Sequence, residues 1–418
     1  MSGDYAGTPV PENATVPGWR VALIIASFTF ALPAFLNGAQ TGLALGFVHA
    51  VTAAFLSGLI LCAGACLTAV LSVRTRLTTY VLIQRSFGIQ GAALVNIVLA
   101  LIHFCWFGVN VSFFGDAMTV AHDQGYGIPG NFQIYVILGS VLITFSTIYG
   151  FKMLDRLAII AVPLVGVILI AVCIAAIRGN ASLDFSPMDK PPVSMSFGLA
   201  LSALVGGNML TVAAMPDLSR FIKTERGAIL GMALSFPLTA PLVMVVSALI
   251  ALATLRTDIM QLVNDLGFGA PALVVLLVSV WTINALNLYS AGLSLAATFP
   301  KVPQRVFVIV GGIVGCCCAL FGIIDHFIPF LVTLGLIIPP IAAIYVIDGF
   351  TIFHAKAEIV PERFRWSAIA VWLLSLAITL PVTSLGWQFT TIPALDATLL
   401  AAVLYSLSRR VWPDPIAQ

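Results

Sequence analysis

The chain has 418 residues, of which 60% are apolar and only 9% are charged. Soluble proteins carry about 25% charged residues, so this composition excludes a water-soluble globule. The formal net charge of +2 excludes a nucleic-acid-binding protein, because it leaves no basic face to neutralise phosphates. We therefore expect a protein whose main solvent is the lipid bilayer.

Twelve stretches of the chain are long and apolar enough to form membrane-spanning helices of about 20 residues. They cover residues 20–46, 51–73, 88–121, 131–149, 156–177, 195–213, 226–254, 269–298, 305–323, 326–348, 366–386 and 392–408. Because the runs are continuous rather than alternating, they do not fit an outer-membrane barrel. The polar first 19 residues lack the pattern of a cleavable signal peptide, so the first span is expected to be its own insertion signal.

The basic residues are distributed unevenly between the loops of this twelve-helix topology. If the N-terminus is cytoplasmic, 16 of the 19 Lys and Arg residues lie in cytoplasmic segments. The three exceptions are Arg178, Lys190 and Arg256. The positive-inside rule therefore predicts a multi-pass protein of a bacterial-type inner membrane, with both termini in the cytoplasm.

The first and the sixth predicted spans contain residues that interrupt helices. These are Pro33, Asn37, Gly38 and Gln40 for the first span, and Gly206, Gly207, Asn208 and Pro216 for the sixth. Any one of them has a plain packing or kink role as an alternative. Breaks at matching places in two halves, however, are typical of transporters built from inverted repeats.

This pattern predicts an all-α integral membrane fold with two five-helix repeats of opposite orientation. The first repeat would cover residues 20–177 and the second residues 195–348, and two further helices would occupy residues 366–408. Residues 1–19 and 409–418 would form the cytoplasmic tails.

Polar side chains cluster on the third predicted helix, where His103, Trp106 and Asn110 share one face. An indole ring beside an amide and an imidazole suits a planar heteroaromatic ligand, through stacking and paired hydrogen-bond donors and acceptors. The alternative is a tryptophan packed between helices and an amide bonded to a neighbouring helix. Amides and exposed backbone on the sixth and eighth spans extend the candidate substrate site. Its expected residues are His103, Trp106, Asn110, Gly207, Asn208, Asn284 and Asn287.

Hydroxyl groups on the eighth predicted helix offer a candidate cation site. Ser279 and Thr282 lie three residues apart, and oxygen atoms freed near the break in the first helix, around Ser27 and Ala31, would complete an oxygen cage. The alternative is that these hydroxyls bond carbonyl groups of their own helix. We expect no cofactor, and the coupling cation would be sodium or a proton.

Few ionisable groups lie near membrane depth. They are His103, Asp116, Asp155, Asp217 and Asp348. Asp217 with Arg220, and Asp155 with Arg156, are interpreted as pairs that set helix ends. The chain has no phosphate-binding loop and no zinc, serine-hydrolase or paired-carboxylate motif, so we expect neither an ATP-driven pump nor an enzyme. The seven cysteines lie mostly in apolar runs without metal or disulfide spacing, and are expected to be buried hydrophobic residues.

Short strings in a consistent order along nearly the whole chain resemble the nucleobase:cation symporters of family one, and most of all their cytosine permease branch. The strings are Leu77-Thr78-Thr79, Ser86-Phe87-Gly88, Trp106-Phe107-Gly108-Val109, Asp217-Leu218-Ser219-Arg220-Phe221, Trp281-Thr282-Ile283-Asn284, the run from Leu288 to Leu293, and Pro339-Pro340. The resemblance implies a leucine-transporter-type fold with two trailing helices. It also implies uptake of a purine, pyrimidine or related ring with sodium or a proton, by alternating access.

The resemblance further implies that Trp106 stacks on the substrate while Asn110, Gly207, Asn208 and Asn284 complete the pocket. The family usually has an aromatic ring at the position of Asn208, so one-sided stacking is expected here. The expected partners are a small heterocyclic substrate and the lipid bilayer, and the protein is expected to be a monomer. Two alternatives stay open: a symporter for a hydantoin-like or allantoin-like ring or a vitamin precursor, and a membrane receptor that does not transport.

Overall fold

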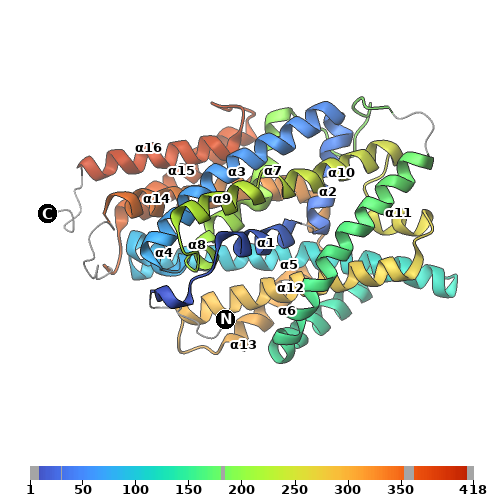
Figure 1. The fold of residues 1–418 in the computed structure, drawn as a ribbon, viewed down its shortest axis with the longest axis horizontal. Coiled ribbons are helices and arrows are strands. Elements are labelled where there is room, and N and C mark those ends of the chain that lie inside the picture. The colour runs from blue at the N-terminus through green and yellow to red at the C-terminus, as the bar shows by residue number, and fades with distance from the viewer. Residues whose placement is uncertain (1–8, 30, 180–183, 353–361, 412–418) are drawn as a thin grey trace.

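The structure is a computed structural model that describes residues 9–29, 31–179, 184–352 and 362–411. Its named elements within these ranges are all helices (Figure 1), as the sequence predicted. In chain order they are η1 (Glu12–Ala14), α1 (Gly18–Thr29), α2 (Leu32–Leu45), α3 (Phe47–Thr75), α4 (Thr79–Phe87), α5 (Ile89–Tyr126), α6 (Phe132–Gly179), α7 (Phe197–Ala213), α8 (Met215–Ser219), α9 (Glu225–Ser235), α10 (Thr239–Thr254), α11 (Ile259–Asp265), α12 (Gly269–Thr298), α13 (Gln304–Leu320), η2 (Ile323–His326), α14 (Phe327–Thr351), α15 (Trp366–Ser384) and α16 (Pro393–Val411).

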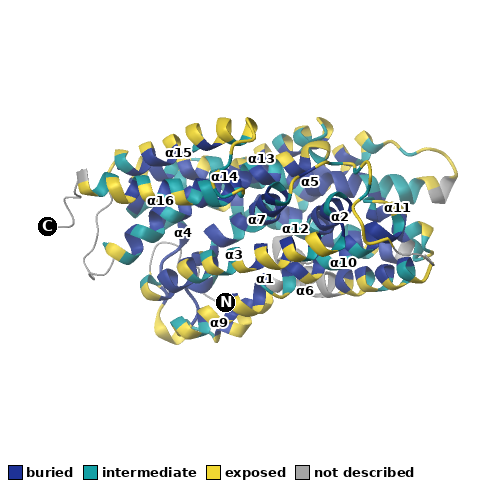
Figure 2. Ribbon diagram, turned by 90° about the horizontal axis from the view of Figure 1, so that it is seen from above, coloured by how far each residue is buried: buried dark blue, intermediate teal, exposed yellow. Residues whose placement is uncertain are grey.

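Seven helical segments among the described residues are long and apolar enough to cross a membrane. They are Phe47–Thr75, Ile89–Asp123, Phe132–Tyr149, Glu225–Thr254, Ala272–Thr298, Ile323–Thr351 and Trp366–Ser384. Shorter apolar helices cover Leu164–Gly179, Phe197–Ala213 and Gln304–Leu320. Exposed residues lie along the periphery of the bundle and buried residues fill its interior (Figure 2), and many of the exposed residues are large and apolar. Such a surface suits contact with lipid rather than water.

The predicted interruption of the first span is present and lies slightly earlier than Pro33. Helix α1 ends at Thr29 and α2 begins at Leu32, with Ala31 in an extended conformation (φ −116°, ψ 149°) between them. Pro33 lies in the first turn of α2, where its missing N–H costs no helical hydrogen bond. Asn37, predicted near the break, is therefore helical.

The predicted interruption of the sixth span at Gly206-Gly207-Asn208 is wrong, because α7 runs through all three residues. The chain leaves the helix only at Ala214, before Pro216 enters the short helix α8. Gly206 instead allows close helix packing, since a Cβ there would overlap the carbonyl oxygen of Leu331 on α14. Glycine is common both where helices are interrupted and where two helices pack closely, and Gly206 is of the second kind.

The predicted fourth and fifth spans are not separated by a loop, since both belong to the single helix α6. A straight helix of its 48 residues would be about 72 Å long, more than twice the hydrocarbon thickness. In Figure 1 the teal first part and the green second part of α6 run in different directions, so the helix bends. The side chains around this bend, including Asp155 and Arg156, lie outside the described residues.

Two short helices, α4 and α11, are not predicted by the membrane-span pattern. Helix α4 begins with a side-chain cap, because the hydroxyl of Thr78 accepts a hydrogen bond from the N–H of Val81 at 3.3 Å.

The seventh predicted span is divided into α9 and α10 by a turn at Phe236–Leu238, which contains Pro237. The eighth to twelfth predicted spans correspond to α12, α13, α14, α15 and α16.

Candidate functional site

A cavity of about 800 Å³ lies between α1, α2, α4, α5, α7, α8, α10, α12 and α14. Its deep part is lined by buried residues, among them Asn37, Asn110 and Leu331. Towards the other end its lining includes Leu293 and Ala297 on α12, which are exposed. The cavity therefore runs from the middle of the bundle to one mouth, on the side of α4 and α8.

Helix α5 contributes the row of polar and aromatic side chains that its sequence predicts. His103, Trp106 and Asn110 all line the cavity, together with Asn96 and Leu99 nearer the mouth. The spacing of three and four residues keeps these side chains on one face of the helix. The predicted group on the third span is thus brought together at one cavity wall.

Aromatic neighbours fix the Trp106 ring in that wall. Its ring centroid lies 6.3 Å from that of Phe327 and 5.4 Å from that of Phe330, with interplanar angles of 80° and 72°. Edge-to-face contacts of this kind add to the stability that area burial alone supplies. A ligand in the cavity therefore meets an indole ring whose orientation is set before binding.

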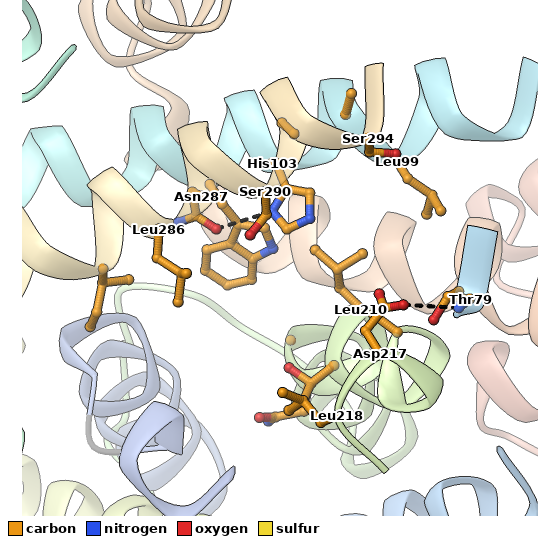
Figure 3. Close-up of a pocket in the computed structure, with 18 of the residues that line it drawn as sticks. Thr79, Leu99, His103, Leu210, Asp217, Leu218, Leu286, Asn287, Ser290 and Ser294 are labelled. Atoms are coloured by element: carbon orange, nitrogen blue, oxygen red, sulfur yellow. Dashed lines mark hydrogen bonds between the residues drawn. The ribbon is translucent and has the colours of Figure 1, made fainter. Parts of the chain in front are cut away.

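The polar groups of this wall are partly engaged with the protein (Figure 3). The Nδ1 atom of His103 lies 3.1 Å from the side-chain oxygen of Asn287 on α12. Asn110 donates its amide N–H to the carbonyl oxygen of Trp106 at 2.9 Å, while its own side-chain oxygen is buried without a protein partner. Buried polar atoms are costly when unpaired, so such an oxygen favours an added donor.

Helix α7 lines the cavity with Gly207, Asn208, Leu210 and Thr211. Asn208 donates a long hydrogen bond of 3.5 Å to the carbonyl oxygen of Leu204, one turn earlier in the same helix. A Cβ at Gly207 would fit without a clash, since its nearest neighbour would lie at an ordinary contact distance of 3.6 Å. Both predicted residues of the sixth span therefore lie at the cavity, although the helix is unbroken.

The structure separates the two amides predicted on the eighth span. Asn287 lines the cavity, but Asn284 is fully buried outside its lining, and neither polar atom of its amide has a protein partner. The face of α12 towards the cavity instead carries Ile283, Leu286 and Ser290 around Asn287.

Of the three candidate cation residues whose side chains are described, one lies in the cavity lining. Ala31 lines the cavity, whereas Ser279 and Thr282 are buried away from it. Thr282 donates its hydroxyl to the carbonyl oxygen of Ser279 at 2.9 Å, and the hydroxyl of Ser279 has no protein partner. The side chain of Ser27 lies outside the described residues. Within the residues that the structure describes, no group of three His, Cys, Asp or Glu side chains could hold a metal ion.

Several lining residues are not predicted as site residues from the sequence. Asn37 lies beside Gly207 and donates its amide N–H to the carbonyl oxygen of Ala203 at 3.4 Å. Tyr80 and Gln84 reach the mouth from α4. Tyr80 and Gln84 are hard to recognise from the sequence, because α4 is too short to be predicted as a membrane span. Asn37 is hard to recognise because the sequence places it among the residues that interrupt the first span.

Among the residues that the structure describes, the charged groups in the cavity lining lie near its mouth. A carboxylate oxygen of Asp217 accepts a hydrogen bond from the N–H of Thr79 at 2.9 Å (Figure 3), and Arg220 lies close by in the lining. These two residues were predicted as a pair at a helix end. Burial raises the pKa of the neighbouring Tyr80 phenol, so this group stays a neutral hydrogen-bonding side chain.

Two of the predicted ionisable groups, Asp116 on α5 and Asp348, are not in the cavity lining. Asp348 on α14 is fully buried and lies 2.8 Å from the guanidinium of Arg365, which precedes α15. Tyr405 on α16 donates its hydroxyl to both oxygens of Asp348 at 2.9 Å. This cluster joins three helices and has the features of a structural ion pair.

Comparisons with known proteins agree with this architecture. Residues 9–406 match the sequence profile of a family described as permeases for cytosine/purines, uracil, thiamine and allantoin. The cytosine permease of Escherichia coli strain K12 is 26% identical over 412 residues, covering 97% of this chain and 94% of the relative. The cytosine permease of Escherichia coli O157:H7 is equally similar.

Solved structures of transporters share the fold. The inward-facing conformation of Mhp1 has a TM-score of 0.79 at 19% identity and covers 97% of this chain and 96% of its own. Mhp1 in a closed conformation with bromovinylhydantoin bound has a TM-score of 0.73 at 20% identity, with 99% and 97% covered. A substrate-bound, outward-open Na⁺-coupled sialic acid symporter has a TM-score of 0.68 at 10% identity, with 99% and 92% covered.

The chain is thus a multi-pass membrane protein with the leucine-transporter-type helical fold, and it is a transporter rather than an enzyme. The profile match over almost the whole chain identifies its family. The protein belongs to the permeases for cytosine, purines, uracil, thiamine and allantoin, the nucleobase–cation symport-1 family of secondary transporters.

Proposed function

We propose that this transporter imports a nucleobase, or a closely related neutral planar heterocycle, together with a cation by alternating access. The observation that carries the proposal is the cavity wall in which Trp106 stands beside Asn110, His103 and Asn287. An aromatic face binds the flat ring of a heterocycle, and the amide and imidazole groups bind its polar edge.

The hydrogen bond between His103 and Asn287 determines which hydrogen-bond donors and acceptors the edge of the ligand should present. With the side-chain oxygen of Asn287 as acceptor, Nδ1 of the neutral His103 ring carries the proton. The other ring nitrogen, Nε2, is then an acceptor, and the amide N–H₂ of Asn287 is a donor. An acceptor beside a donor complements a ring edge that presents N–H next to C=O or a ring nitrogen, as nucleobases do.

The distribution of charge supports a neutral substrate. Asp217 and Arg220 are the only Asp, Glu, Lys or Arg residues in the lining, within the described part of the chain, and both lie near the mouth. An ionised ligand in the deep part would lose its hydration without gaining an opposite charge, which is expensive in a low-dielectric interior. A neutral heterocycle avoids that cost.

A twelve-helix topology accounts for the described helices. The seven long and three shorter apolar segments become twelve when the broken pair α1–α2 and the terminal helix α16 are added. Residues 20–177 and 195–348 then form the two inverted repeats, residues 366–408 the trailing pair, and residues 1–19 and 409–418 the tails. The mouth beside Arg220 faces the side on which 16 of the 19 Lys and Arg residues are predicted to lie, so it opens to the cytoplasm of a bacterial-type inner membrane.

For the coupling ion, Ser279 supports sodium as the first candidate and a proton as the second. Its buried hydroxyl lacks a protein partner, and hydroxyl oxygens are ligands that hard cations prefer. Thr282 is engaged with a carbonyl of its own helix and would have to turn to join such a site. Ala31 lies at the helix break, and its carbonyl oxygen accepts hydrogen bonds from the N–H groups of Ala34 and Phe35 at 3.0 and 3.3 Å.

A second candidate substrate is a hydantoin-like or allantoin-like ring or a vitamin precursor. Asn208 is the residue that favours it, because a further amide in the lining suits a ring with more polar edges than cytosine has. The similarity to Mhp1, whose structure holds bromovinylhydantoin, is in keeping with such a ligand.

One experiment distinguishes these substrates and tests the proposal. Purified protein is screened by thermal shift against purines, pyrimidines, hydantoins and vitamin precursors, with and without sodium, since a ligand that binds the native state raises its melting temperature. Hits are then tested for accumulation in proteoliposomes under a cation gradient. Binding without accumulation would instead indicate a receptor.

Trp106→Ala provides the matched test of the site. Stacking on an aromatic ring contributes about 1–3 kcal/mol, so this variant should bind the hit about five- to 150-fold more weakly. Trp366→Ala is the control, because Trp366 is 67% exposed at the start of α15 and lies outside the cavity. Unchanged affinity in Trp106→Ala would refute the proposed site.

A further inference from the structure

Helix α4 connects the cavity mouth to the two C-terminal helices. One side of α4 lines the cavity, with Tyr80, Val81 and Gln84 in the wall. Its C-terminal end lies against the segment that precedes α15. The residues that make this junction belong to neither the substrate site nor the candidate cation site.

Hydrogen bonds fix this C-terminal end on α15. The guanidinium of Arg365 donates to the carbonyl oxygen of Arg85 at 2.9 Å, and the backbone N–H of Arg365 donates to the carbonyl oxygen of Phe87 at 3.1 Å. Just beyond α4, the N–H of Ile89 donates to the carbonyl oxygen of Glu362 at 2.9 Å, and the N–H of Gln90 donates to the carbonyl oxygen of Arg363, also at 2.9 Å. Carbonyl groups at a helix end need such partners, and here they come from the trailing helices.

Arg365 is itself held in place by a buried carboxylate. The same nitrogen that donates to Arg85 lies 2.8 Å from Asp348, and both side chains are almost completely buried. Tyr405 on α16 bonds the same carboxylate at 2.9 Å. The planar guanidinium can serve a carboxylate and a carbonyl together, which a lysine ammonium on a flexible stem does with less geometric control.

The other end of α4 is tied to a different part of the bundle. Thr79 donates its N–H to Asp217 beside α8, and Arg76, just before α4, donates to the carbonyl oxygen of Arg220 at 3.0 Å. Arg76 has a positive φ of 60°, which is uncommon for a residue with a side chain. The segment Arg76–Thr78 therefore forms a bent connection between α3 and α4.

We propose that Arg365 is a positioning residue for transport, which holds α4 on the C-terminal helices so that Tyr80 and Gln84 form the fixed wall of the cavity mouth. Arg365 alone supplies two hydrogen bonds to the C-terminal end of α4, and two more join the start of α5 to the same segment before α15. When the mouth changes its width, α4 then stays with α5 and the segment before α15. The inference builds on the proposed transport cycle but concerns a wall that any substrate must pass.

The test measures the exposure of α4 directly, in a background without the native cysteines. Gln84→Cys reports on α4, and Leu293→Cys on α12 reports on the opposite part of the mouth. Both are labelled with a membrane-impermeant maleimide. Arg365→Lys should speed labelling at position 84 by about three- to tenfold, the factor that one or two hydrogen bonds supply, and leave position 293 unchanged. No substrate is needed, so the result is independent of the proposed function.

Tyr405→Phe is the control for a merely structural role. It removes hydrogen bonds from the same carboxylate, and so lowers the melting temperature, but leaves the contact between Arg365 and Arg85 in place. We expect labelling at position 84 to stay within twofold of the parent in this variant. Equal acceleration in Tyr405→Phe and Arg365→Lys, or none in Arg365→Lys, would overturn the proposal.

A second pair of variants keeps the test usable if Arg365→Lys fails to fold. Gly88→Ala places a Cβ 2.9 Å from the carbonyl oxygen of Glu362 and so forces apart the same junction without removing a charge. Gly127→Ala introduces the same kind of backbone strain at the far end of α5, where nothing lies within 4 Å. Only Gly88→Ala should accelerate labelling at position 84, and equal rates in both variants would contradict the proposal.

Discussion

The Nδ1 atom of His103 lies 3.1 Å from the side-chain oxygen of Asn287, and this contact joins α5 to α12 in the wall of the cavity. It orients two groups at once, since it fixes which ring nitrogen of His103 carries the proton and which end of the amide is left for a ligand. Substrate recognition should therefore depend on the pair rather than on either residue alone.

This dependence predicts a non-additive double mutant. His103→Ala and Asn287→Ala should each weaken ligand binding by about three- to tenfold, because each removes one hydrogen bond and misorients its partner. The loss of affinity in the double variant should be much smaller than the product of the two single losses, as expected for groups in contact. Titration of the hit from the ligand screen by thermal shift or calorimetry measures this. Strict additivity would show that the two side chains act separately.

Ligand analogues test the same edge without changing the protein. Methylation of the ring N–H that faces Nε2 of His103 should lower affinity by about tenfold or more, because it removes a donor and leaves the acceptor buried and unpaired. Methylation elsewhere on the ring should cost less, provided that the cavity of about 800 Å³ has room. If all methylated analogues bind equally well, the His103–Asn287 edge does not contact the substrate.

The two adjacent glycines of α7 should respond differently to alanine. Gly206→Ala would force a Cβ into the carbonyl oxygen of Leu331 and separate α7 from α14, at a cost of about 1–3 kcal/mol. Gly207→Ala should fold normally, since its Cβ would have ordinary contacts at 3.6 Å or more. Melting temperatures in detergent compare the two directly. Equal stability would mean that α7 and α14 are less closely packed than the structure places them.

These glycines also illustrate where the sequence stops being informative. The rows of apolar residues and the three- and four-residue spacing of His103, Trp106 and Asn110 depend only on helical geometry, so they could be predicted. Whether a glycine interrupts a helix or admits a neighbouring one depends on the partner helix, which for Gly206 is more than a hundred residues away. The bend without a break in α6 is equally hard to predict, because Gly150 and Pro163 signal either a bend or the end of a helix.

The rotation of α12 could not be predicted for the same reason. Asn284 and Asn287 are equally polar and lie on overlapping faces, yet only Asn287 reaches the cavity. Packing decides between them, because Trp281 on α12 donates its indole N–H to Ser146 on α6 at 2.9 Å and also contacts the ring of Phe114. The burial of Asn284 follows from contacts with distant helices.

The predicted orientation in the membrane can be tested at the two ends of the bundle. Ala297 is exposed at the cavity mouth, and Phe389 is 96% exposed in the segment between α15 and α16. With both termini cytoplasmic, Ala297→Cys should react with an impermeant maleimide only in inside-out vesicles, and Phe389→Cys only in intact cells. The reversed pattern would mean that the positive charges lie outside.

The coupling ion leads to the last prediction, which centres on Ser279. Its hydroxyl is buried without a protein partner, so in the absence of sodium Ser279→Ala should be as stable as the parent or slightly more stable. If sodium binds there, adding it should raise the melting temperature of the parent through mass action and leave that of Ser279→Ala almost unchanged. Ser247→Ala is a suitable control, because Ser247 is equally buried but donates to the carbonyl oxygen of Val243 on its own helix at 2.7 Å. A sodium-dependent shift retained in Ser279→Ala would place the ion elsewhere. The absence of any shift in the parent, with uptake driven by a pH gradient, would identify a proton as the coupling ion.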